Sequence, residues 1–159
     1  MKKIFALVFA VAMIFSMAFS AFASDVVIEY NTAYVLKFDC DDEVEIAFGG
    51  DGDNSNEGVF TVDVSGMNKL FVAFDTDPNE SIAAANEGAQ MYFVNFNGIQ
   101  FNRSGEYVYE LEGAAAAYQI VDNKLVEIPD VKIADDEIVF KTRVLGNYVF
   151  AKSALVNPA

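Results

Sequence analysis

Apolar and polar residues alternate with a period of two along most of the chain between residues 26 and 152, and a helical period of 3.6 is almost missing. This pattern predicts an all-β protein, because neighbouring side chains of a strand point to opposite faces of a sheet. Strands are expected at residues 26–30, 33–38, 43–48, 58–64, 69–74, 91–96, 105–111, 117–121, 125–128, 137–144 and 148–152. Turns are expected between them, for example at Asn97-Gly98, Ser104-Gly105 and Gly146-Asn147. We therefore predict a sandwich of two antiparallel sheets, immunoglobulin-like or jelly-roll-like.

One segment of the domain favours a short helix instead. Residues Asn79 to Gly88 (NESIAAANEG) offer an asparagine or aspartate cap, two turns of helix-forming residues and a glycine stop. We expect a helix of about two turns here.

The first 23 residues have the order of a secretory signal peptide. Two lysines precede an apolar run from Ile4 to Phe15, and small residues follow at Ala21 and Ala23. Interruptions at Ser16 and Ser20 argue against a retained transmembrane anchor. We predict a signal helix at residues 1–23, cleavage after Ala23 or alternatively after Ser20, and a single secreted domain at residues 24–159.

Charge and cysteine content narrow the classes of partner. The chain carries 24 acidic and 10 basic residues, a net charge of −14, so nucleic acid and anionic membrane surfaces are disfavoured. The single cysteine, Cys40, cannot form an internal disulfide and lies among carboxylates that raise a thiol pKa. We interpret Cys40 as a passive thiol, with intermolecular pairing as the alternative.

Catalysis is disfavoured because the chain has no histidine. This excludes Ser-His-Asp and Cys-His sets and every imidazole acid or base. Two carboxylates could still cleave a glycosidic bond, but no pair of the 24 acids has a distinctive context. We predict that the protein is not an enzyme.

Two acidic turns have the oxygen spacing of a calcium loop. Asp75, Asp77 and Asn79 match its first, third and fifth positions, and Asp51 and Asp53 match the first and third. Neither turn has the glycine at the sixth position or the acid at the twelfth. Solvated turns are therefore the favoured interpretation, calcium is the alternative, and no other cofactor is expected.

An aromatic strip lies in the predicted strand at 105–111. Tyr107 and Tyr109 share one face, opposite Glu106 and Glu110. The favoured interpretation is that both tyrosines face the core, and the alternative is that they hold a sugar ring.

The last third of the chain contains Lys141-Thr142-Arg143-Val144-Leu145-Gly146-Asn147-Tyr148-Val149. Together with Tyr92-Phe93-Val94-Asn95-Phe96, it resembles the closing strands of secreted β-sandwich domains from Gram-positive gut bacteria, which end in a Thr-Arg, Leu-Gly and Tyr-Val hairpin. The resemblance implies the fold and carries no assigned activity. From the residues themselves, Lys141 and Arg143 are expected to face outward and pair with acids across the sheet.

These observations lead to one hypothesis with two alternatives. The protein is expected to be a secreted, non-catalytic binding or interaction module for a protein or glycan outside the cell. The alternatives are a small carbohydrate-active enzyme that uses two carboxylates, and a self-assembling subunit whose strand at 26–30 pairs with a neighbour's sheet edge.

Overall fold

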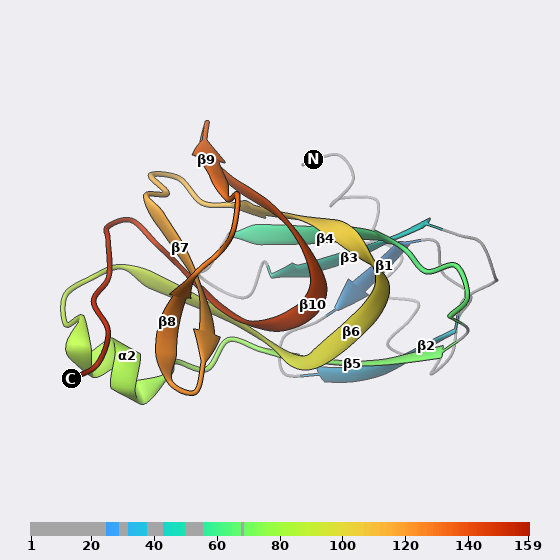
Figure 1. The fold of residues 1–159 in the computed structure, drawn as a ribbon, viewed down its shortest axis with the longest axis horizontal. Helices are drawn as coiled ribbons and strands as arrows, with labels where there is room; N and C mark the ends of the chain where they lie inside the picture. Colours follow the sequence, from blue (N-terminus) through green and yellow to red (C-terminus); the bar gives the residue numbers. More distant parts are fainter. Residues whose placement is uncertain (1–24, 29–31, 38–42, 50–55, 68) are drawn as a thin grey trace.

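The computed structural model describes residues 25–28, 32–37, 43–49, 56–67 and 69–159. The signal peptide predicted at 1–23, together with Cys40, Asp51 and Asp53, lies outside these residues. The described part contains ten strands and one helix (Figure 1). The strands are β1 (Asp25–Ile28), β2 (Thr32–Lys37), β3 (Glu43–Gly49), β4 (Glu57–Asp63), β5 (Lys69–Asp75), β6 (Met91–Glu110), β7 (Ala116–Val121), β8 (Lys124–Glu127), β9 (Lys132–Ala134) and β10 (Glu137–Ala151), and the helix is α2 (Glu80–Ala85).

Strands β6 and β10 form the spine of the fold. They pair antiparallel along nearly their whole length, from Met91 opposite Ala151 to Glu110 opposite Glu137. At one end of this pair, β4 flanks β6 and β9 flanks β10. At the other end, β5 flanks β6 and β7 flanks β10. Both long strands curve, so a single hydrogen-bonded sheet of ten strands folds into two layers (Figure 1).

The first layer contains β1, β3, β4, β9, the second half of β6 and the first half of β10. The second layer contains β2, β5, β7, β8, the first half of β6 and the second half of β10. The prediction of an all-β, sandwich-like fold is confirmed, with both layers built from one continuous sheet. One pairing departs from the antiparallel pattern, since β1 runs parallel to β3.

Two apolar clusters stabilise the layers. The larger one fills the space between them and is dominated by aromatic rings; its fully buried members include Phe48, Phe60, Phe101, Tyr107, Tyr109, Tyr148 and Phe150. The smaller one covers part of the outer face of the second layer. There, Phe93 and Val149 pack with Ile82 of α2 and with Leu155, which follows β10. Helix α2 and the last residues of the chain therefore cover one end of this outer face.

Three of the predicted turns, each at a pair of residues that contains one glycine, are instead bulges or irregular steps within continuous strands. Asn97-Gly98 and Ser104-Gly105 lie inside β6, and Gly146-Asn147 lies inside β10, so the predicted closing hairpin is wrong. The β6–β10 register shifts between Thr142 and Val144 and again between Leu145 and Asn147. The sequence signal is ambiguous because an extra residue in a strand and a turn use the same small and glycine residues.

The largest register shift lies where the two long strands pass between layers. Thr142 pairs with Gly105 and Val144 with Gln100, so four residues of β6 stand opposite Arg143. The Arg143 guanidinium donates to the Phe101 carbonyl at 3.3 Å and to the Asn102 carbonyl at 2.9 Å. The acidic partner expected for Arg143 does not occur among the described residues. Its guanidinium N–H groups instead donate to backbone oxygens that the bulge removes from the hydrogen-bond ladder.

Candidate functional site

The outer face of the second layer carries a row of polar side chains in register. Asp75 of β5 stands opposite Asn95 of β6, and Asn95 stands opposite Asn147 of β10. Ile120 of β7 continues the row beyond Asn147. Adjacent strands are about 4.8 Å apart, so the three polar residues span roughly 10 Å. Asparagine and aspartate are depleted in strands, which makes a row of three unusual.

An open recess of about 420 Å³ lies over this row. Its volume falls in the range of small-molecule sites, roughly 300 to 1,000 Å³. Its polar lining residues are Asp75, Asp77, Asn79, Asn95, Asn97 and Asn147, and its other lining residues are Ala73, Pro78, Phe96 and Ile120. The recess is thus lined by amides and carboxylates over a partly apolar floor.

One rim of the recess is fixed by a small hydrogen-bond network. Asp75 Oδ1 accepts from the Asp77 backbone N–H at 3.0 Å and from Asn95 Nδ2 at 2.8 Å. Asn95 Nδ2 also donates to the Asp77 carbonyl at 2.9 Å. This network holds the 75–77 segment against the sheet, so the recess is formed without a ligand.

Asn79 belongs to the helix as well as to the recess. Its Oδ1 accepts from the Ile82 N–H at 3.1 Å, which caps α2, and its Nδ2 donates to Asn123 at 2.9 Å. The helix predicted at 79–88 is confirmed over Glu80–Ala85 with Asn79 as its N-cap. The cap engages the oxygen that a calcium loop would need from Asn79.

Asn97 extends the pairing of β5 and β6 with its side chain. Its Oδ1 accepts from the Ala73 N–H at 3.1 Å and its Nδ2 donates to the Phe71 carbonyl at 3.0 Å. Asn147 differs, because its exposed amide makes no hydrogen bond to any described residue. The Asn147 side chain thus has both its amide N–H donors and its carbonyl acceptor available to a ligand.

Calcium binding at the recess stays a prediction. Asp75, Asp77 and Asn79 do come together at the recess, as their spacing predicts. Within the described ranges, however, no group of three or more aspartate, glutamate or cysteine side chains is arranged to hold a metal ion. The recess thus offers two carboxylates and several amides, fewer charges than calcium sites with high affinity use.

Tyr107 and Tyr109 lie in the core, with exposed fractions of 0% and 2%. The Tyr107 ring stacks on Phe140, with ring centroids 4.5 Å apart, and the Tyr109 ring stacks on Phe150 at 4.4 Å. The favoured interpretation is correct, and the alternative of a sugar-binding strip is wrong because neither ring has an exposed face. Burial raises the pKa of Tyr107 well above its usual value, and its hydroxyl has no hydrogen-bond partner among the described residues.

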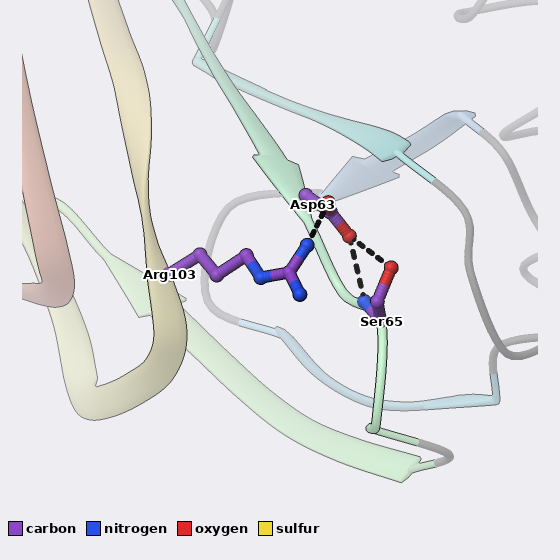
Figure 2. Close-up of polar contacts among 3 residues, drawn as sticks. All are labelled: Asp63, Ser65 and Arg103. Carbon is purple, nitrogen blue, oxygen red and sulfur yellow. Dashed lines mark hydrogen bonds and ion pairs between the residues drawn. The ribbon is translucent and has the colours of Figure 1, made fainter.

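An ion pair links the end of β4 to the bulge of β6. Arg103 Nη1 lies 2.5 Å from Asp63 Oδ2, while Asp63 Oδ1 accepts from the backbone N–H of Ser65 at 2.8 Å and from its hydroxyl (Figure 2). The Ser65 hydroxyl lowers the pKa of Asp63 most, followed by the Ser65 N–H, with a smaller contribution from Arg103. All three groups lie at the surface, away from the recess.

The lowered pKa of Asp63 predicts a dependence of stability on pH. The unfolded chain takes up this proton at about pH 4, before the folded chain does, so the contribution is present above that pH and is lost as pH falls through the folded pKa. We expect Asp63→Asn to reduce the loss of stability between pH 6 and pH 3, measured as the shift in the urea midpoint. Glu112→Gln, at an exposed turn, is the control. An equal acid-induced loss in wild type and Asp63→Asn would contradict the prediction.

Sequence reasoning did not find Asn95, Asn97 or Asn147. The signal was available, because each occupies a strand position at which the period of two places it outside the sandwich core. Asn97-Gly98 and Gly146-Asn147 were instead interpreted as turns. That interpretation removed two of the three asparagines from the sheet face.

Comparison with protein-family models, with curated proteins and with solved structures finds no match to this chain. Within the part of the chain that the structure describes, no helix has the length and apolar character to cross a membrane.

Proposed function

We propose that the protein is a secreted, non-catalytic binding module and that the recess over β5, β6 and β10 is its binding site. The observation that carries this proposal is the in-register row of Asp75, Asn95 and Asn147. Helix α2 and Leu155 cover the neighbouring apolar part of the same face, whereas this polar row stays open. Export is supported by the signal-peptide pattern at residues 1–23.

The chemistry of the recess favours binding over catalysis. Its two carboxylates, Asp75 and Asp77, lie two residues apart on one rim, and Asp75 is hydrogen-bonded to Asn95. Cleavage of a glycosidic bond needs two carboxyl groups on opposite sides of the bond. No tyrosine of the described part of the chain lines the recess. These features support the module over the enzyme.

The proposal is tested by NMR on the purified, ¹⁵N-labelled protein. The side-chain amide signals of Asn95 and Asn147 report on the recess during separate titrations with neutral oligosaccharides, calcium chloride and a lysine-rich peptide. We expect at least one probe to shift these signals, and Asn147→Ala to weaken that probe's binding. Asn102→Ala, on the same sheet but outside the recess, is the matched control. If no probe moves the recess signals, or if the shifts cluster elsewhere, the proposal is wrong.

A further inference from the structure

Phe71 is an exposed aromatic residue next to the recess. It lies on β5, where Leu70, Val72 and Phe74 are buried and Phe71, Ala73 and Asp75 point outward. Its side chain is 55% exposed, and the other large apolar residues exposed within residues 43–49, 56–67 and 69–159, Val121, Val126 and Val156, are aliphatic. A single exposed apolar side chain is ordinary in itself. Its position is the informative feature, because Ala73 and Asp75, the next outward residues of β5, line the recess.

Helix α2 leaves Phe71 uncovered. The helix packs through Ile82 on Phe93 and Val149, at the other end of this outer face. The Asn97 side chain holds β5 at the Phe71 carbonyl and at the Ala73 N–H. The exposed ring is thus mounted on a fixed strand beside the polar row.

The free polar atoms of the row suit hydroxyl groups. Among the described residues, Asp75 Oδ2 and Asn95 Oδ1 accept no hydrogen bond, and the Asn147 amide is unpaired. A hydroxyl group both donates and accepts, so it can satisfy acceptors and an amide donor in the same row. No lysine or arginine of the described ranges lines the recess, and its two carboxylates disfavour an anion.

From this arrangement we propose that the recess binds a neutral oligosaccharide, with one sugar ring packed on the face of Phe71 and another ring of the same chain bonded to Asp75, Asn95 and Asn147. This inference rests on the proposed function and names its ligand class. The apolar C–H face of a sugar matches the electron-rich face of a phenyl ring. Phe71 lies four residues from Asp75 along β5, about 13 Å at roughly 3.3 Å per residue, so a chain of several sugar rings can reach from the aromatic platform to the polar row.

The experiment is isothermal titration calorimetry of the purified protein with neutral cello-, xylo- and malto-oligosaccharides, alongside the calcium and peptide probes. For the oligosaccharide that binds, we expect Phe71→Ala and Asn147→Ala each to weaken affinity by about tenfold or more. Phe71→Trp should keep or raise the affinity, because the stacking surface is retained. Val156→Ala and Asn102→Ala, which alter exposed residues outside the recess, should leave it unchanged. The Phe71 ring makes no ring–ring contact among the described residues, so its removal should not disturb the core. Thermal melts should therefore show that the Phe71→Ala variant is folded.

The outcomes separate the two proposals. If calcium or the peptide shifts the Asn95 and Asn147 signals and no neutral oligosaccharide binds, the carbohydrate inference is overturned and the binding site stands. Carbohydrate binding that survives Phe71→Ala unchanged would overturn the inference as well. If no probe affects the recess, both proposals fail.

Discussion

Removal of residues 154–159 lowers the free energy of unfolding by about 4 kcal/mol and causes the protein to self-associate. The larger part of this loss comes from Leu155, which is buried against Ile82, Phe93 and Val149. Deleting a buried leucine side chain costs about 2 to 5 kcal/mol, because its transfer free energy is lost and a cavity remains. Here the deletion also uncovers the apolar outer face of the second layer.

Hydrogen bonds between asparagine amides and the backbone hold this segment in place. The Asn86 side chain accepts from the Val156 N–H at 2.8 Å and donates to the Val156 carbonyl at 2.9 Å. The Asn157 side chain accepts from the Leu125 N–H at 2.6 Å and donates to the Leu125 carbonyl at 3.3 Å. Asn157 thus occupies backbone groups of β8, an edge strand of its layer. An uncovered strand edge beside an apolar face is a template for pairing between chains.

Urea denaturation and light scattering check the two parts of this prediction. Asn157→Ala exposes the β8 edge while it keeps Leu155, and Leu155→Ala empties the apolar site while it keeps the edge covered. We expect Leu155→Ala to account for most of the lost stability and Asn157→Ala for most of the tendency to associate. Val156→Ser, at a side chain that is 60% exposed, is the control. A truncated protein that stays monomeric with an unchanged urea midpoint would contradict the assignment.

The fold class was predictable because its signal repeats in almost every strand. Burial along β5 alternates as the period of two requires, burial along β3 does so except at Ala47, which is also buried, and the helix begins after Asn79. The three-residue strand β9 was not predicted, since so short a segment carries no measurable period.

The continuity of β6 and β10 could not be read from the sequence. A turn and a bulge both interrupt the alternation and both favour glycine. At Gly98 the backbone takes a φ of +73° inside β6 instead of reversing direction. What keeps the strand continuous is its long pairing with β10. That information is non-local, so no window of the sequence contains it.

The candidate site shows the same division between local and non-local information. The spacing of Asp75, Asp77 and Asn79 predicted a cluster of oxygens, and the structure places all three at the recess. The row itself needs the register of β5 with β6 and of β6 with β10, which brings Asn95 and Asn147 together from positions 52 residues apart. Spacing along the chain could therefore identify the rim of the recess, but not the asparagines that complete the row across the sheet.

Gly105→Ala lowers the free energy of unfolding by about 3 kcal/mol, the second-largest effect we expect. A Cβ atom at Gly105 would lie 2.5 Å from Phe60 Cζ and 2.6 Å from the Thr61 carbonyl oxygen, well inside van der Waals contact. The Phe60 ring cannot move aside, because it is fully buried and packs against Phe101 and Tyr107. Thr61 is also fixed, since it pairs with Glu106 of β6. The extra methyl group must therefore be accommodated by a shift of β6 where it passes between the layers.

Gly98→Ala is the matched control on the same strand. Its φ of +73° is unfavourable for alanine, but no atom lies within 4 Å of its added Cβ, so we expect a loss of only about 1 kcal/mol. Urea denaturation of both variants separates overpacking from backbone strain. In the Gly105→Ala background, Phe60→Leu should restore part of the stability because it removes the atoms that clash, although in the wild type the same change is destabilising. If the two changes simply add, the clash with Phe60 does not cause the loss, and the close packing of β4 on β6 does not explain why residue 105 is glycine.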